Sequence, residues 1–319
     1  MTSVHKTARG SAPGPSAPGG GRAGAVTLPT GRRKWRSRAY LFLAPALLMY
    51  TAFVIAPWVQ AVELSFYDWD GVSPGVWTGL DNYRAVLTDP QLVGSLIHAL
   101  GFIGFYSVLP IAAGLLLAAV IGRGRRGGNF AFARTVLFLP QIIPLVAVGV
   151  IWRGLYAPEG LVNQALRAVG LDSWTRAWLG DFTWAYFAVG LVGSWVMLGL
   201  CLVLFQSGIQ KIDTSLYEAA RIDGAGAVRE FFAVTLPGLR AEIAVAVTVT
   251  VIAALASFDV VFVTTDGGPG DTTTVPGVLI YRLAFTSGQV GTACALAVVL
   301  SLLISLVVLA IARLTRERA

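Results

Sequence analysis

Residues 182–207 read FTWAYFAVGLVGSWVMLGLCLVLFQS and contain no Asp, Glu, Lys or Arg. A helix rises about 1.5 Å per residue, so about 20 apolar residues cross the roughly 30 Å of hydrocarbon in a bilayer. The run lacks the two-residue alternation of a barrel strand and is more than twice as long as one. The sequence therefore predicts a membrane-spanning helix here.

Five further segments share this character, namely residues 39–62, 92–121, 135–157, 241–264 and 287–312. The composition agrees, because only 13% of the 319 residues are charged, whereas a soluble domain carries about 25%. We expect an all-α integral membrane protein with six transmembrane helices. This excludes an ordinary water-soluble enzyme.

The Lys and Arg residues predict the orientation of these helices. Six spans place 19 of them on the side of both termini and of loops 122–134 and 208–240, and five on the other side. Lys and Arg gather in cytoplasmic loops, so we expect cytoplasmic tails at residues 1–38 and 313–319. The first tail is rich in Gly, Ala, Pro and Ser and is expected to be disordered. The segment 39–62 is too long for the core of a cleaved signal peptide.

The chain contains neither of the usual energy sources of a transporter. None of its three lysines follows a glycine, which excludes a phosphate-binding GxxxxGK[ST] loop. Asp259 is the only charged residue well inside an apolar segment, whereas ion-coupled carriers keep such groups in the bundle. The two histidines, His5 and His98, have no metal-ligand spacing. We expect no catalytic residue and no metal site, and a partner that supplies energy.

The loop between the fourth and fifth spans, residues 208–240, reads GIQKIDTSLYEAARIDGAGAVREFFAVTLPGLR. Ser215 and Glu218 have the spacing of a capping box, and Gly224 suits a left-handed helix end. We expect a second short helix from Ala225 to Leu236, stopped by Pro237. The apolar members are too many for a solvated loop, so one face is expected to dock on another surface: Leu216, Ala219, Ala220, Phe231, Phe232 and Val234.

This loop resembles the EAA loop of the membrane subunits of binding-protein-dependent ABC importers. The matching residues are Glu218, Ala219, Ala220, Gly224, Leu236 and Pro237, with Val234 where the family normally has Ile. Further segments resemble the carbohydrate branch, and the resemblance covers residues 39–312. They are Gly79 to Tyr83, Asp89 and Pro90, Leu139 and Pro140, Trp152, Gly160, Leu161 and Asn163, Phe258 and Asp259, Gly267 to Gly270, and Ile280 to Arg282. His98 and Ala99 depart from the Asn and Thr often found there.

The resemblance implies a type I ABC importer permease fold, similar to the maltose transporter, and the import of a sugar or oligosaccharide. It implies four kinds of partner: a second homologous permease, a cytoplasmic ATPase dimer that uses ATP and Mg, an extracytoplasmic solute-binding protein, and membrane lipid, with no nucleic acid. This chain would bind no cofactor itself. The residues implied in coupling to the ATPase are Glu218, Ala219, Ala220, Asp223, Gly224, Leu236 and Pro237. Glu218 is open to two roles, the capping-box acid and a contact with the partner.

The translocation path is less clear from the sequence. Gln141, Trp195, Phe258 and Asp259 are polar or aromatic residues at membrane depth and are candidates to contact the substrate, although packing or helix bending explains each one singly. Three alternatives stay open: a permease for a non-sugar solute, a self-sufficient secondary transporter, and a membrane-embedded transferase or hydrolase. The Ala-, Gly- and Arg-rich composition is typical of actinobacteria.

Overall fold

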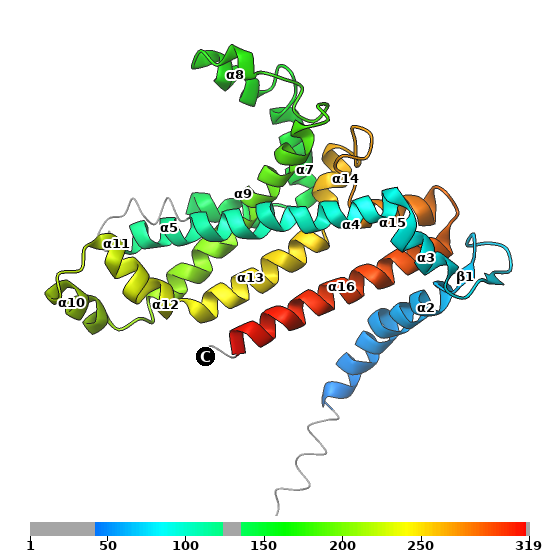
Figure 1. The fold of residues 1–319 in the computed structure, drawn as a ribbon, viewed down its shortest axis with the longest axis horizontal. Helices are drawn as coiled ribbons and strands as arrows, with labels where there is room; N and C mark the ends of the chain where they lie inside the picture. The colour runs from blue at the N-terminus through cyan, green and yellow to red at the C-terminus, as the bar shows by residue number, and fades with distance from the viewer. Residues whose placement is uncertain (1–41, 124–134, 317–319) are drawn as a thin grey trace, which may run out of the picture. The chain divides into compact units, whose positions relative to one another are not determined.

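A computed structural model describes residues 42–123 and 135–316 (Figure 1). The predicted tail at 1–38, the end of the tail at 313–319 and the basic residues Arg125, Arg126 and Arg134 lie outside the described residues. The chain divides into two units at Ile55 and Ala56. Within the described part of the first unit, the segment from Phe42 to Ile55 is helical and ends in a π-helical turn, Thr51–Ile55.

Four of the predicted spans are confirmed as helices long and apolar enough to cross a membrane. They are Phe42–Leu64, Pro90–Val120, Trp184–Ile209 and Val290–Thr315. The first contains α2 (Ala56–Leu64), and the second contains α4 (Pro90–Ile103), a π-helical turn (Gly104–Val108) and α5 (Leu109–Arg123). The other two are α9 (Trp184–Ile209) and α16 (Val290–Arg316).

The third predicted span, 135–157, is not one straight helix. Thr135–Gln141 and α7 (Leu145–Leu155) meet at 109°. The bend lies at Pro144, which has φ −55° and ψ 135°, outside the helical region. Proline has no N–H to donate and disfavours helical geometry in the residue before it. Pro144 therefore explains why one apolar run forms two helices.

The prediction of a single helix over 241–264 is wrong. Helix α13 (Arg240–Leu255) ends early, and a separate helix, α14 (Asp259–Thr264), follows. A Cβ added at Gly277 would lie 3.2 Å from the Ser257 carbonyl oxygen and 3.1 Å from the Phe258 Cβ. The break is thus packed directly against a glycine far along the chain. Asp259 begins a short helix instead of lying within a long one.

Shorter elements connect the spans. At the end where the second and fourth spans begin, they are the hairpin β1 (Tyr67–Asp68) and β2 (Val76–Trp77), α3 (Asp81–Thr88), α8 (Leu161–Ala168) and α15 (Pro276–Phe285). At the other end are α10 (Thr214–Ile222), α11 (Ala227–Glu230) and α12 (Leu236–Gly238). A π-helical turn, Phe231–Thr235, joins the last two into one helix, Ala227–Gly238.

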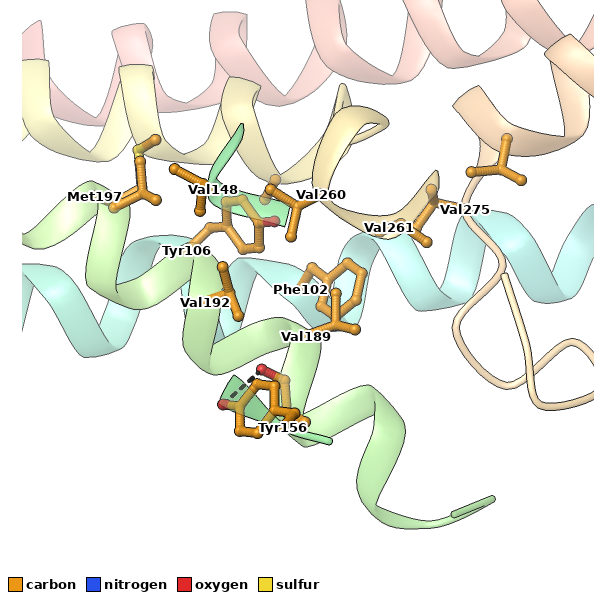
Figure 2. Packing of buried hydrophobic residues seen from close by; sticks show 14 residues of the cluster. Phe102, Tyr106, Val148, Tyr156, Val189, Val192, Met197, Val260, Val261 and Val275 are labelled. Carbon is orange, nitrogen blue, oxygen red and sulfur yellow. Dashed lines mark hydrogen bonds between the residues drawn. The ribbon is translucent and has the colours of Figure 1, made fainter. Parts of the chain in front are cut away.

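The largest apolar core lies where α4, α9, α7 and α14 meet (Figure 2). Phe102 and Tyr106 pack against Val189 and Val192 of α9. Gly193 leaves no room for a Cβ beside the ring of Tyr106, so this glycine permits the close approach of the two helices. The core also contains Val148 of α7 and residues of α14, and the two broken spans therefore pack together.

Candidate functional site

The N-cap residue of helix α10 is Asp213, not Ser215. The Asp213 carboxylate accepts a hydrogen bond from the Ser215 N–H at 2.9 Å. This bond lowers the pKa of Asp213. The predicted capping box is therefore wrong, because aspartate two residues earlier takes the N-cap position. Glu218 lies in the second turn with an exposed side chain. Of the two roles considered for it, the capping role is excluded and the contact with a partner is left.

The turn after α10 is confirmed at Gly224. This residue has φ +75°, in the left-handed region that disfavours other residues. Its N–H donates to the Arg221 carbonyl at 3.0 Å, and the Ala225 N–H donates to the Ala220 carbonyl at 2.9 Å. A Cβ at Gly224 would meet nothing within 4 Å among residues 42–123 and 135–316. Backbone conformation alone therefore explains the glycine here.

The helix after the turn differs from the prediction of Ala225–Leu236. It begins at Ala227 and continues through Pro237 to Gly238. The π-helical turn immediately before Pro237 has already shifted the hydrogen-bond pattern, which is how a helix accommodates a residue without an N–H. After Leu239 the chain turns by 71° into α13.

Polar contacts hold these elements together. Arg221 Nε donates to Glu230 Oε2 at 3.0 Å across the turn. Tyr217 Oη and Thr235 Oγ1 lie 3.2 Å apart. Before α10, Lys211 Nζ donates to Glu242 Oε1 at 3.0 Å, in the first turn of α13. Helix α10 is thus connected to the following helix and to the start of the fifth span.

The loop also presents an apolar face that the described residues leave uncovered. Leu216, Ile222, Val228 and Phe232 are exposed, with Ile222 at 86%. Ala219 is exposed, Ala220, Phe231 and Val234 are half-buried. The sequence analysis missed Ile222 and Val228, although Ile222 lies four residues after Glu218 on the same side of α10. Of the remaining predicted residues, Asp223 caps the end of α10, Leu236 is half-buried and Pro237 is exposed.

The four candidate path residues lie in two groups. Trp195 of α9 contacts Trp152 of α7, with ring centroids 5.5 Å apart, while Phe258 stacks on Phe262 at 5.0 Å. Phe258, Phe262 and Trp152 all border the core of Figure 2. Gln141 lies just before the bend in the third span, and Asp259 just after the break in the fifth; both are half-buried.

Three of the four buried polar atoms that have no hydrogen-bond partner among the described residues belong to the two broken spans. They are Gln141 Oε1, Trp152 Nε1 and Ser257 Oγ, and the fourth is Gln206 Nε2 of α9. An unpaired buried polar atom costs free energy unless water or a ligand satisfies it. Ser257 and Trp152 were not predicted as path residues: Ser257 does not differ in the sequence from an ordinary packing residue, and Trp152 was noted only as part of the family resemblance.

Residues 110–318 match the family described as binding-protein-dependent transport system inner membrane component. The chain belongs to this family. The match covers α5 to α16, so it includes the 208–240 loop and both broken spans. The permease is therefore a multi-pass subunit of the cytoplasmic membrane.

Relatives with assigned names are also permeases of this kind. The permease is 39% identical over 262 residues to a probable ABC transporter permease, YurN, of Bacillus subtilis, covering 82% of this chain and 89% of the relative. It is 35% identical to the diacetylchitobiose uptake permease NgcF of Streptomyces coelicolor, covering 82% and 77%. It is 30% identical to the multiple sugar-binding transport permease MsmF of Streptococcus mutans, covering 84% and 91%.

A solved structure supports the fold. A chain of a bacterial ABC transporter for the polysaccharide alginate superposes with a TM-score of 0.77 at 23% identity, covering 90% of the permease and 96% of that chain. Together with the family match, this confirms the predicted type I importer permease fold.

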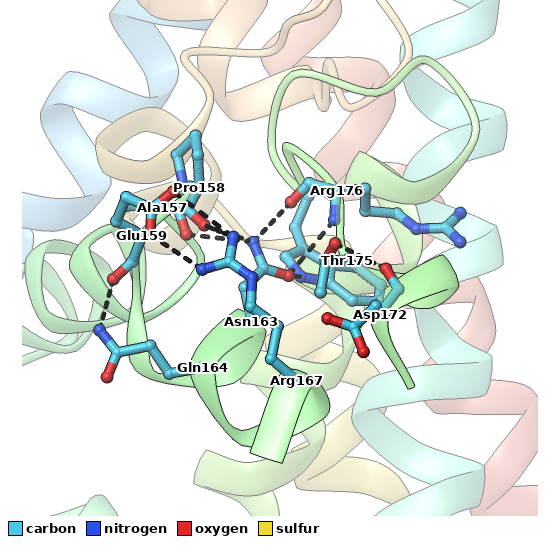
Figure 3. Close-up of polar contacts among 10 residues, drawn as sticks. Ala157, Pro158, Glu159, Asn163, Gln164, Arg167, Asp172, Thr175 and Arg176 are labelled. Carbon is cyan, nitrogen blue, oxygen red and sulfur yellow. Dashed lines mark hydrogen bonds and ion pairs between the residues drawn. The ribbon is translucent and has the colours of Figure 1, made fainter. Parts of the chain in front are cut away.

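At the end opposite the 208–240 loop, a second segment of the permease has its own polar core (Figure 3). Asn163 of α8 is 1% exposed. Its amide nitrogen donates to the carbonyls of Ala157, Pro158 and Arg176, the last at 2.8 Å. Its oxygen accepts from the Arg176 N–H and from Trp178 Nε1, the latter at 2.8 Å. One neutral side chain thus fixes the loop from Ala157 to Trp178.

Arg176 and Arg167 make further contacts within this segment. The Arg176 guanidinium lies 4.6 Å from the ring of Trp184 and 5.3 Å from that of Trp178, which is cation–π geometry. Arg167 pairs with Glu159 at 2.9 Å. The hydrogen bond from Arg167 lowers the pKa of Glu159.

Proposed function

We propose that the permease carries a sugar or oligosaccharide into the cell as one subunit of an ATP-driven, binding-protein-dependent importer that works by alternating access. The observation that carries this proposal is the exposed apolar face of the 208–240 loop in a chain of this family. Relatives named for diacetylchitobiose, starch degradation products, lactose and multiple sugars support the substrate class.

We assign the proposed partners to the two opposite ends of the permease. An ATPase dimer, which binds ATP and Mg, docks on the 208–240 loop, and this end is cytoplasmic because 19 of the 24 Lys and Arg residues fall on its side. A solute-binding protein delivers substrate at the opposite end. A related transporter structure holds a periplasmic protein with bound alginate pentasaccharide. A second permease completes the pathway. An actinobacterial source remains a prediction from composition.

Coupling is assigned to Glu218, Ala219, Ala220, Asp223 and Gly224 in and after α10, with Leu236 and Pro237 in the following helix. The alanines allow close approach to the partner, and the exposed Glu218 offers it a carboxylate. Ile222 and Val228 add apolar area that is costly to leave in water.

The proposed path runs along the two broken spans, past Gln141, Trp195, Phe258 and Asp259. Sugars present hydroxyl groups and apolar ring faces, which match unpaired polar atoms beside aromatic rings. Gln141 Oε1 and Ser257 Oγ supply the former, and Trp195 and Phe258 the latter. Non-helical backbone at membrane depth occurs only where it is buried or lines a water-filled cavity, which supports placing the path here.

A non-sugar solute is the second candidate. A permease of Synechocystis named for the uptake of osmoprotective compounds is 32% identical over 83% of this chain and 94% of that protein. A polar osmolyte would need the same hydrogen-bonding groups but not the aromatic faces.

Reconstitution into liposomes tests the proposal. The permease alone should neither hydrolyse ATP nor take up labelled diacetylchitobiose, lactose or maltotriose. Together with the ATPase, permease and binding protein encoded beside it, it should import at least one of them when ATP is supplied. Uptake by the lone chain under a proton gradient would instead establish a secondary transporter. Import of proline, an osmolyte without a sugar ring, but of none of the three sugars, would favour the second candidate.

A further inference from the structure

Two polar contacts lie at different distances from the Gly224 turn. The Arg221–Glu230 ion pair is close to the turn, at 3.0 Å, and the Tyr217–Thr235 hydrogen bond is one helical turn farther away, at 3.2 Å. A turn with a single contact beside it still permits the two helices to swing apart. Two contacts spaced along the helices fix the angle between α10 and Ala227–Gly238.

The ion pair is not an ordinary surface pair. The Glu230 side chain is 7% exposed, whereas that of Arg221 is 62% exposed. A carboxylate removed from water is costly unless charged or hydrogen-bonding groups compensate it. The buried Glu230 carboxylate thus accepts its charged hydrogen bond from an arginine whose own side chain is mostly in solvent.

The helix that carries Glu230 leads directly into the membrane part. It is continuous from Ala227 to Gly238 and turns into α13 through the fully buried Leu239. The Lys211–Glu242 ion pair, at 3.0 Å, connects the start of the loop to the same end of α13. A displacement of α10 therefore passes along this helix to α13 only if the angle at Gly224 is maintained.

We propose that Arg221 and Glu230 are positioning residues that lock α10 to the helix Ala227–Gly238, so that movement of the ATPase shifts α13 instead of opening the Gly224 turn. This inference rests on the proposed coupling role of the loop. Without the lock, part of each displacement of α10 is absorbed by the turn, and ATP is hydrolysed with less transport.

The test compares Glu230→Gln, Arg221→Gln and the double variant in the complete transporter, reconstituted in liposomes. The measured quantity is sugar imported per ATP hydrolysed, with whichever of diacetylchitobiose, lactose or maltotriose the wild type imports. Each single variant should lower this ratio about threefold to tenfold, and the double variant no further, because either substitution removes the contact that the two residues share. Arg221→Lys keeps the charge and should retain most of the ratio.

Arg167→Gln is the matched control, since it removes an Arg–Glu pair of similar length at the other end of the permease. It should leave the ratio unchanged. A loss with Arg221→Gln but not with Glu230→Gln would contradict the proposal, because the exposed Arg221 would then act by touching the ATPase. Unchanged ratios in all variants would also contradict it.

A distance measurement separates positioning from folding. Spin labels at Leu216→Cys and Val228→Cys, on a background without Cys201 and Cys294, report the angle in the isolated permease. Glu230→Gln should broaden the distance distribution, and an unaltered distribution would overturn the proposal. Failure of both Gln variants to insert would overturn it as well, since the pair would then serve folding. Gly224→Asp tests the proposed function itself. Normal uptake by this variant would contradict the coupling role of the loop. Lost uptake by this variant, with normal behaviour of the Arg221 and Glu230 variants, would contradict only the proposed positioning role of the ion pair.

Discussion

The Arg221–Glu230 and Arg167–Glu159 pairs have nearly the same N–O distance, 3.0 and 2.9 Å, and join residues nine and eight positions apart. Their carboxylates differ in exposure, 7% against 81%. The exposed pair is screened by water and contributes little. Around it, the segment 157–178 is fixed instead by the neutral, buried Asn163. Burial, not distance, therefore decides which polar contact determines local structure.

Among these variants, Gly224→Asp, in the 208–240 loop that contains the Arg221–Glu230 pair, should have the largest effect on transport. It places a Cβ at a left-handed position, which costs about 1 kcal/mol or more locally, and adds a charge to the proposed interface. Membrane abundance should stay near normal while uptake is lost and ATPase co-purification falls. Gly226→Ala is the control, because Gly226 has φ −72° and open space around its Cβ position; equal losses in both variants would contradict the argument from conformation.

Single-cysteine labelling should distinguish the two ends completely. Val72 is 93% and Ile222 86% exposed, so a cysteine at either position is reachable by a thiol reagent from its own side. In intact cells lacking Cys201 and Cys294, an impermeant reagent should label Val72→Cys and not Ile222→Cys. Permeabilised cells that lack the ATPase subunit should label both. The reverse pattern in intact cells would overturn the proposed orientation.

Asn163→Ala should destabilise the other end of the permease. It removes five hydrogen bonds and leaves buried carbonyls without their donor, with an expected cost of about 2–4 kcal/mol. Lower thermal stability in detergent and faster proteolysis within 157–178 would show this. Gln164→Ala removes one exposed hydrogen bond and should change neither quantity. Equal behaviour of the two variants would mean that burial of Asn163 is unimportant.

Arg167→Ala should have the smallest effect, visible only through pH. Arg167 lowers the pKa of Glu159 in the folded state, so the pair contributes above the unfolded pKa of about 4.3 and is lost as pH falls through the folded value. Thermal unfolding of wild type and variant should differ slightly at pH 7 and converge as the pH falls through the lowered folded-state pKa of Glu159. A difference that grows on acidification would contradict this assignment.

The sequence predicted those features that depend on neighbouring residues. An unbroken apolar run forms α9, and a glycine followed by a new helical segment gives the left-handed turn at Gly224. The N-cap was misplaced by two residues, because Asp213 and Ser215 both suit that position and only the backbone path selects one.

Features that involve contacts between residues far apart in the sequence could not be predicted from neighbouring residues. No proline or glycine lies at Ser257 to mark the break, and the segment packs against Gly277, twenty residues later. Glu230 looks like any exposed acid in a short amphipathic helix until α10 folds against it. Asn163 belonged to a recognised family pattern, but its five hydrogen bonds need Arg176 and Trp178 in place.

The glycines of α9 have a further consequence for how this sequence can evolve. At four positions an added Cβ would collide with another part of the chain: Gly190 with Phe105, Gly193 with Tyr106, Gly199 with Leu137 and Gly208 with Leu239. Exposed positions such as Leu191 are free to drift among apolar residues, whereas these four reject even alanine unless a neighbour moves. The positions of these glycines therefore reflect which segments pack against α9. Where a relative has a larger residue at one of them, the neighbouring residue should be changed as well.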